Sequence, residues 1–278
     1  MALPVLATTY ERHEDRMNDH FAHAEWQEVR QEADAMIKMR PNSVEPYAAG
    51  LIAAQFMEDF KATNMYLKNS QANRVHIDSL LNCVYVRTKR LHNAPIYEQL
   101  LLNLKANNKG FTRVFNLYLL EFYAFARKTH ETIAIADELL QVTPDNIRFK
   151  KIKAIALFAQ GDSQEAVKLY ETVLAKDSTD YDVLTFLGAY YAVQDSKDLS
   201  RIDSLYTSTQ LPIDSLFTAR KQDIIDNRIP RTLDLLQRAY NIRPSDYLRN
   251  ELEKLSKLDS KLPTHPSKKK KKQAQRSI

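Results

Sequence analysis

Apolar residues along most of this chain recur at the three- and four-residue spacing of an amphipathic helix. The run FKKIKAIALFAQ, residues 149–160, presents one apolar face, and a second run, SQEAVKLYETVLAKD, follows at 163–177. Between them, Gly161 suits the left-handed conformation that ends a helix, and Asp162 or Ser163 suits the cap of the next one. The pattern predicts a helix–turn–helix pair over this stretch.

The same kind of pair returns at a fixed spacing. Amphipathic segments end at Pro144, Ser178, Pro212 and Pro244, at intervals of 34, 34 and 32 residues. Pro41 lies 103 residues before Pro144, close to a multiple of the same period. Such self-similarity is typical of arrays in which each helix pair buries its apolar face against its neighbours. The sequence therefore predicts an all-α solenoid.

Small and bulky residues also repeat at fixed places in these pairs. They are Ala166, Tyr170 and Val173 in one pair, and Leu184, Leu187, Gly188 and Tyr191 in the next. Together with the period, this pattern resembles the tetratricopeptide repeat (TPR) family, most closely over residues 110–195 and more loosely over 8–260. The resemblance implies a right-handed superhelical solenoid of about seven TPR-like helix pairs, in which small residues admit the side chains of a crossing helix.

The repeat divides residues 1–260 into a TPR-like helical repeat domain. The expected helix pairs are at 8–41, 42–72, 73–109, 110–144, 145–178, 179–212 and 213–244. Residues 245–260 are expected to form a C-terminal capping helix, because an array needs a polar outer face at its end. Residues 261–278 are expected to be a disordered, lysine-rich tail. A different repeat of helical hairpins is the structural alternative.

The scarcity of glycine removes several chemistries. The chain has four Gly and one Cys, and it contains none of the glycine motifs that cradle phosphates or expose a nucleophilic serine. Cys83 lies inside the apolar run SLLNCVYV, where a lone thiol is more often a core residue than a nucleophile. We therefore expect a protein that is not an enzyme, with no catalytic residues and no cofactor.

The net charge of +5 comes from the end of the chain. Residues 263–278 carry six basic residues and no acid, so residues 1–262 have a net charge of −1. Contacts to nucleic acid or to an anionic membrane surface are therefore expected only through the tail, from Lys268, Lys269, Lys270, Lys271 and Lys272. Binding through this tail, with the repeats as a spacer, is the alternative function, and it would be non-specific and sensitive to salt.

Three histidines, His13, His20 and His23, fall on one face of the first predicted helix. Neutral imidazoles are common metal ligands, so a metal site is one interpretation of this face. The other interpretation is that the terminal pair uses imidazoles as packing residues. Because no cysteines or second histidine cluster complete a ligand set, we expect packing and no metal.

In TPR arrays the first helices of successive pairs line a concave groove. The resemblance therefore implies a partner-binding groove on Leu117, Tyr118, Glu121, Phe125, Arg148, Lys151, Ile155, Phe158, Asp182 and Phe186. Glu121 is the one charge within FNLYLLEFYAF, and an ionised carboxylate on an apolar surface is costly without a partner. We expect it to pair with Arg148 or Lys151.

The function implied by such a groove is that of a protein–protein interaction scaffold. Its partner is expected to be another protein that contributes a peptide or a helical segment, with no small-molecule substrate. One TPR subgroup binds the acidic C-termini of Hsp70 and Hsp90 chaperones through a Lys-x3-Asn pattern. Here Lys151 is followed at that spacing by Ile155, so the resemblance does not extend to that partner.

The start of the chain bears on location. No apolar stretch approaches the roughly 18 residues needed to span a bilayer. The opening MALPVLATTYERH is broken by Pro4 and has no basic residues before its apolar part, so we do not expect it to act as a secretory signal. The expected location is cytoplasmic, or exported if a signal sequence preceded this start.

Overall fold

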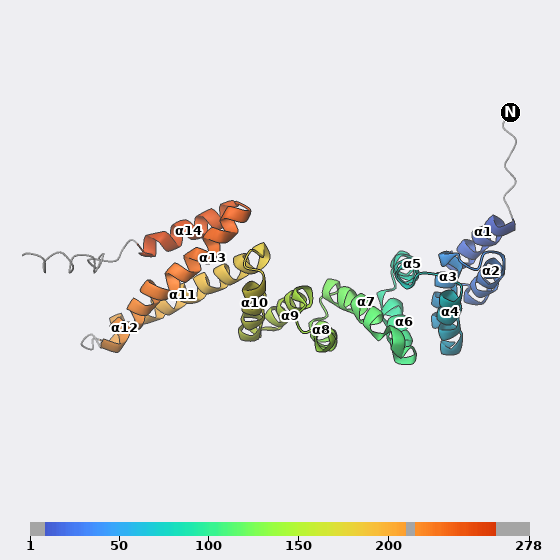
Figure 1. Ribbon diagram of the computed structural model, residues 1–278, viewed down its shortest axis with the longest axis horizontal. Helices are drawn as coiled ribbons and strands as arrows, with labels where there is room; N and C mark the ends of the chain where they lie inside the picture. Colours follow the sequence, from blue (N-terminus) through green and yellow to red (C-terminus); the bar gives the residue numbers. More distant parts are fainter. Residues whose placement is uncertain (1–8, 210–214, 260–278) are drawn as a thin grey trace, which may run out of the picture. The chain divides into compact units, whose positions relative to one another are not determined.

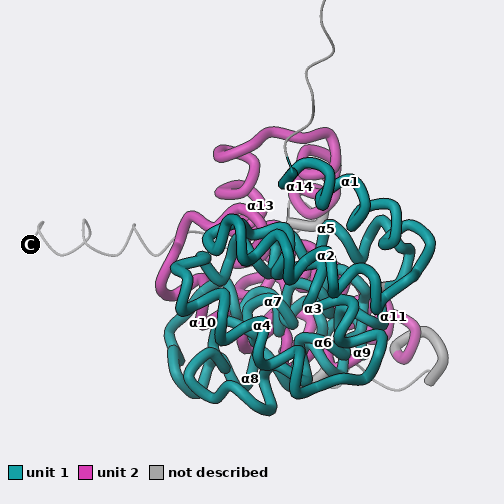
Figure 2. The backbone as a smooth tube through the Cα atoms, turned by 90° about the vertical axis from the view of Figure 1, so that its right-hand side faces the viewer, with its two compact units in different colours: residues 1–160 teal, residues 161–278 magenta. Residues whose placement is uncertain are grey.

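The computed structural model describes residues 9–209 and 215–259, and every regular element in this part of the chain is helical (Figure 1). The prediction of an all-α fold is confirmed. Two compact units, residues 1–160 and residues 161–278, are coloured separately in Figure 2. The tail residues Lys268 to Lys272 lie outside the described residues. Within the described ranges, no helix is both long enough and apolar enough to cross a lipid bilayer.

The first unit is built from helices of thirteen or fourteen residues that follow one another as helix–turn–helix pairs. Its helices are α1 (Thr9–Ala22), α2 (Trp26–Met39), α3 (Val44–Phe56), α4 (Phe60–Ala72), α5 (Ile77–Arg90), α6 (Ala94–Asn107), α7 (Thr112–Phe125), α8 (Thr129–Val142) and α9 (Ile147–Gln160). A short 3-10 turn, Lys109–Phe111, precedes α7. The helices α1 to α8 fall within the four pairs predicted between residues 8 and 144.

Each pair of the first unit turns on a residue with positive φ that is not glycine. In the first turn, the N–H of Glu25 bonds to the carbonyl oxygen of His20 at 2.9 Å across the left-handed residue Ala24, as in a Schellman motif. The left-handed residues of the four pairs lie at intervals of 34, 34 and 35 residues: Ala24, Glu58, His92 and Arg127. The backbone thus repeats with the period that the prolines indicate.

Side-chain caps begin the second helix of two of these pairs. Asp59 accepts a hydrogen bond from the N–H of Ala62 at 2.9 Å, and Asn93 accepts one from the N–H of Ile96 at 3.2 Å. Such caps satisfy N–H groups that have no partner within the helix. The turns are therefore fixed by local hydrogen bonds on both sides of the left-handed residue.

The core of the first unit runs along its helices, and α3 lies deepest in it. Residues 46–55 of α3 are all buried, and α3 packs against α2, α4, α5 and α6. Gly50 allows the ring of Tyr66 to approach closely, since a Cβ at Gly50 would lie 2.6 Å from that ring. The hydroxyl of Tyr66 donates to Asp34 at 2.7 Å, so the polar end of this buried side chain is satisfied.

A buried cation connects three helices of the first unit. Arg87 on α5 is 8% exposed and donates to Glu45 on α3 at 2.6 Å and to Asn18 on α1 at 3.2 Å. Burial alone would raise the pKa of Glu45, but the hydrogen bonds and charge of Arg87 outweigh this effect and hold that pKa below its usual value. The ionised carboxylate therefore contributes to the stability of this unit.

The second unit departs from the regular pattern. It contains α10 (Ser163–Lys176), α11 (Tyr181–Thr209), α12 (Ser215–Asp223), a π-helical turn at Ile224–Arg228, α13 (Ile229–Ile242) and α14 (Asp246–Asp259). The sequence predicted two helices over 179–212 and two more over 213–244. Instead, α11 is one helix of 29 residues, and residues 215–242 are helical throughout. The two packed segments form one long hairpin.

The expected break within 179–212 is wrong because the chain offers no local reason to turn there. Counted from Gly161, the next left-handed residue would fall 34 positions on, at Asp195. Asp195 instead lies inside α11, is 1% exposed, and contacts Arg228 at 2.6 Å and Thr232 at 3.0 Å. Asp195 therefore lies at the contact with the facing helix, at a position that sequence spacing assigns to a turn.

The π-helical turn has an identifiable cause next to it. The N–H of Ile229 bonds to the carbonyl oxygen of Ile224, five residues earlier. Pro230 follows, and a proline supplies no N–H and its ring clashes with the carbonyl four residues before it. The wider turn accommodates the proline within a continuous helix.

Several details predicted around α10 are confirmed. Gly161 has a φ of +100°, and Asp162 caps α10 by accepting the N–H of Glu165 at 3.2 Å. Ala166 and Val173 are fully buried. Tyr170 between them is 4% exposed, so the predicted small, bulky and small positions of this pair are all buried.

At Gly188, α11 and α13 approach each other closely. A Cβ at this position would lie 2.6 Å from Cδ2 of Leu236, so the two helices can cross at this distance only because Gly188 has no side chain. At the end of the described chain, α14 packs against α13 and buries Leu248 and Leu255, while Tyr247 remains 50% exposed.

Candidate functional site

The residues predicted to line a groove lie on three helices in two units. Leu117, Tyr118, Glu121 and Phe125 are on α7, Arg148, Lys151, Ile155 and Phe158 are on α9, and Asp182 and Phe186 are on α11. The first eight belong to the first unit and the last two to the second. The candidate site described here is therefore the α7–α9 face of the first unit.

This face exposes large apolar side chains. Phe125 is 82% exposed, Ile155 59% and Phe158 45%. Leu117 and Tyr118 are half-buried and pack partly against the core, and Lys151 is also half-buried. Phe125 lies on α7, and Ile155 and Phe158 lie on α9, so both helices of this face carry large apolar side chains that solvent reaches.

The predicted pairing of Glu121 is confirmed. Arg148 on α9 donates to Oε1 of Glu121 on α7 at 2.5 Å. Both side chains are more than half exposed, and solvent-exposed ion pairs of this kind contribute about 0–1 kcal/mol. The pair can therefore open at little cost when another charge approaches.

A cavity of about 290 Å³ lies beside Glu121. Its lining comes from α5, α6 and α7: Asn82, Tyr85, Tyr97, Tyr118, Glu121, Phe122 and Phe125. Sequence reasoning found the three of these residues that lie on the expected groove positions of α7, and it missed the remainder. For Tyr85 and Tyr97, the signal in the sequence is the presence of tyrosines in the apolar stretches SLLNCVYV and APIYEQL. These two stretches match the TPR pattern only weakly.

The aromatic rings of this cavity form a connected group. The ring of Tyr97 lies edge-on to Tyr85 at 5.3 Å and to Phe122 at 5.5 Å between centroids. The hydroxyl of Tyr118 donates to the carboxylate of Asp78 on α5 at 3.2 Å. This network fixes the orientation of the aromatic walls.

Negatively charged carboxylates lie close to these tyrosines. Burial, with the carboxylates of Asp78 and Glu121, raises the pKa of Tyr118 to about 12. Burial, with Tyr118, Tyr85 and Glu121 close by, also raises the pKa of Tyr97. The hydroxyls therefore stay protonated at neutral pH, and the local field disfavours further negative charge.

A second cavity on the same unit is mainly apolar. It measures about 410 Å³ and lies between α7, α8 and α9, lined by Ala124, Arg127, Thr129, Thr132, Ile152, Ile155, Ala156 and Ala159. Ile155 thus projects from the rim of a depression. An apolar anchor of a partner can enter such a depression more readily than it can bind a flat surface.

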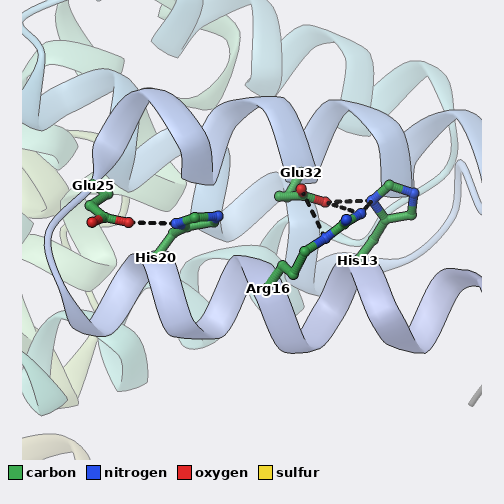
Figure 3. Close-up of polar contacts among 5 residues, drawn as sticks. All are labelled: His13, Arg16, His20, Glu25 and Glu32. Carbon is green, nitrogen blue, oxygen red and sulfur yellow. Dashed lines mark hydrogen bonds and ion pairs between the residues drawn. The ribbon is translucent and has the colours of Figure 1, made fainter.

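The histidines of α1 make polar contacts instead of packing in the core. His13 bonds to Glu32 of α2, and Arg16 joins the same carboxylate at 3.1 Å, as Figure 3 shows. His20 bonds to Glu25 at 2.5 Å, which raises the pKa of His20. His23 is exposed and contacts Asp19. The expectation that these imidazoles are core residues is therefore wrong: His13 and His20 are half-buried, His23 is exposed, and each contacts an acid.

Two other chemistries considered from the sequence are a metal site and a reactive cysteine. No cluster of three or more His, Cys, Asp or Glu side chains that could hold a metal occurs among the described residues. Cys83 is half-buried, and burial together with Glu45 raises the pKa of its thiol to about 12. A thiol with so little thiolate is a poor nucleophile.

Within the second unit, Phe186 lies between aromatic rings. Its centroid is 4.4 Å from that of Tyr170 and 6.3 Å from that of Tyr190, and Asp182 is exposed one turn earlier on α11.

A cavity of about 560 Å³ lies along the long hairpin and includes Asp198, Arg201 and Arg228 in its lining. Arg228 is paired with Asp195 and Asp198, so its charge is already balanced.

No protein-family model and no curated protein matches the chain. Similar solved structures include one from Bacteroides ovatus, with 20% identity over 79% of this chain and 98% of that chain and a TM-score of 0.48. Another is a TPR repeats protein from Bacteroides fragilis, with 15% identity, coverage of 91% and 100%, and a TM-score of 0.42.

A tetratricopeptide repeat protein from Parabacteroides merdae is also similar, with 13% identity, coverage of 89% and 98%, and a TM-score of 0.37. At these identities no function follows from the likeness. The chain's own features are its helical hairpins and the left-handed turns at intervals of 34 or 35 residues. By these features the chain is a TPR-like helical-repeat protein.

Proposed function

We propose that this protein is a non-enzymatic interaction scaffold whose α7–α9 face binds a peptide or helical segment of another protein. The observation that carries the proposal is the exposure of Phe125 and Ile155 on successive first helices, at 82% and 59%. A monomeric surface gains nothing from holding such side chains in water, whereas a few apolar anchors account for most of the binding energy at an interface.

The charges on this face support a peptide ligand. Glu121 and Arg148 lie between the apolar positions and are paired with each other through a contact of low cost. A partner segment with charges of both signs would exchange this pair for contacts of its own. Such pairs add specificity of register to the affinity that the apolar anchors supply.

The test uses peptides selected from a random display library against the full chain, measured afterwards by isothermal titration calorimetry. The double variant F125S/I155S should weaken binding by about tenfold or more, because it removes two anchors of the proposed surface. V142S is the matched control: Val142 is 67% exposed at the end of α8, outside both cavities.

Equal loss in F125S/I155S and V142S would overturn this assignment. A further variant, in which Lys268 to Lys272 are changed to Gln in the full chain, separates the alternative function. Binding through the tail would be abolished by this change and by moderate salt, whereas binding on the α7–α9 face would persist.

A further inference from the structure

We propose that the cavity between α5, α6 and α7 binds the side-chain cation of a lysine or arginine presented by the partner segment. This inference rests on the proposed function and names the chemistry of one anchor of the partner. It is carried by the composition of the cavity wall, by the carboxylates around it, and by the ion pair that Arg148 already makes with Glu121 of the lining.

The wall of the cavity has the chemistry of an aromatic cage. Tyr85, Tyr97, Tyr118 and Phe122 supply ring faces and edges around a space of about 290 Å³, enough for one long side chain. The negative face of an aromatic ring attracts a cation within about 6 Å, and the interaction strengthens when water is excluded. The apolar stem of a lysine or arginine would contact the exposed ring of Phe125 at the rim.

The charged residue in the lining of the cavity is acidic, and the nearest basic partner, Arg148, reaches it from outside the lining. Glu121 belongs to the lining, and Asp78 holds the hydroxyl of Tyr118 at 3.2 Å. Among the described residues, none of the side chains that line this cavity is basic. An anionic side chain would be repelled by these carboxylates, and an apolar one would desolvate them without a new contact, whereas a cation can bind Glu121 beside Arg148.

Arg148 shows where such a cation would bind. Its guanidinium reaches Glu121 from α9 and bonds to Oε1 at 2.5 Å, while 66% of its side chain stays exposed. A carboxylate has two oxygens and can accept several donors. A partner's cation would therefore share Glu121 with Arg148 or displace it, and Arg148 acts as an internal competitor.

The test measures the anisotropy of labelled alanine–glycine peptides that carry lysine, arginine or norleucine at the same places, with the full chain. Norleucine keeps the apolar stem and lacks the charge. The lysine or arginine peptide should bind on the order of tenfold more tightly than the norleucine peptide. E121Q should remove this difference, whereas E131Q, an exposed carboxylate of α8 outside the cavity, should leave it unchanged.

The variant R148Q gives a result that a merely structural role would not produce. Since it frees Glu121 from its internal partner, affinity for the basic peptide should rise several-fold, in the direction opposite to E121Q. Equal binding of the norleucine and basic peptides, equal effects of E121Q and E131Q, or weaker binding by R148Q would each overturn the inference. Circular dichroism of each variant establishes that its helices are retained.

Two further outcomes distinguish a failure of the cation site from a failure of the proposed function. If library peptides depend on Phe125 and Ile155 but show no preference for basic residues, the cation site is wrong and the proposed function stands. The chain's own lysine tail is a competing occupant. If changing Lys268 to Lys272 to Gln raises the affinity for the basic peptide, the tail occupies the cavity and the assignment to a separate partner is overturned.

Discussion

The hairpins of the first unit and the long hairpin of the second differ in what determines where their helices end. In the first unit, helices of thirteen or fourteen residues end at left-handed residues and restart at local caps. In the second, α11 continues through the position of the next turn, and Asp195 there contacts Arg228 and Thr232 on the facing helix. The comparison teaches that local hydrogen bonds set the repeat in one unit, and long-range contacts override it in the other.

The largest effect should come from filling the close approach in the second unit. G188L places a side chain where even a Cβ would lie 2.6 Å from Leu236, so we expect the unfolding free energy to fall by about 2–3 kcal/mol. Urea denaturation followed by circular dichroism measures this loss. The control is G110L, because a Cβ at Gly110 meets nothing within 4 Å; similar losses in both variants would contradict the close-packing account.

A smaller loss should follow from E45Q in the first unit. It leaves Arg87 buried with only Asn18 as a strong acceptor, at an expected cost of about 1–2 kcal/mol at neutral pH, reduced by the solvent that reaches the carboxylate. Because the folded pKa of Glu45 is lowered, its contribution is present above the usual value near 4.5 and is lost as the pH falls through the folded value.

Denaturation curves at several pH values measure this dependence. The difference between the wild type and E45Q should shrink as the solution is acidified. A difference that stays constant from neutral pH to strongly acidic pH would show that the contact contributes through packing and not through charge.

Glycine at the left-handed turns of the first unit should stabilise the protein. Ala24 and Glu58 have φ values of 58° and 54°, which cost a residue with a side chain more than they cost glycine. A24G and E58G should each raise the unfolding free energy by up to about 1 kcal/mol. A22G, at the last residue of α1, is the control and should lower it, since glycine weakens a right-handed helix; stabilisation by A22G would argue against the turn geometry.

The smallest effect is expected at Asp195. Burial raises its pKa despite the hydrogen bond from Thr232 and the charge of Arg228, so the fold gains little from the ionised form. D195N should change the unfolding free energy at neutral pH by less than about 0.5 kcal/mol.

The pH dependence at Asp195 should have the opposite sign to that of Glu45. A raised folded pKa means that stability is fully present below the unfolded pKa and is lost as the pH rises through the folded one. The wild type should therefore gain stability relative to D195N on acidification. A large loss in D195N at neutral pH would show that the ionised pair holds the long hairpin together.

The sequence predicts the regular hairpins well because their determinants are local. Gly161, Asp162 and the buried positions of α10 can be identified from residue type and spacing alone. The turns at Ala24, Glu58, His92 and Arg127 carry no glycine, so their left-handed geometry escapes a search for glycines. The caps Asp59 and Asn93, 34 residues apart, are the signal that could have revealed two of them.

The candidate site is predictable only in part, for a related reason. The ion pair of Glu121 with Arg148 follows from one charge in an apolar run and the repeat spacing. The contributions of Tyr85 and Tyr97 depend on how α5 and α6 pack against α7; the aromatic residues of these two stretches are visible in the sequence, but their arrangement around one cavity is not. The histidines of α1 mislead, because His13 contacts Glu32 across the pair and His20 contacts Glu25 in the turn.

The spacing of the left-handed turns has a consequence for how such a gene can change. Duplication or loss of a coding segment that runs from one turn of the first unit to the next would add or remove one complete hairpin and leave the joints intact, because each joint is closed by residues within a few positions of it. A breakpoint inside α11 would instead divide the surface along which α11 packs against α13, so new copies should arise in the first unit and not in the second.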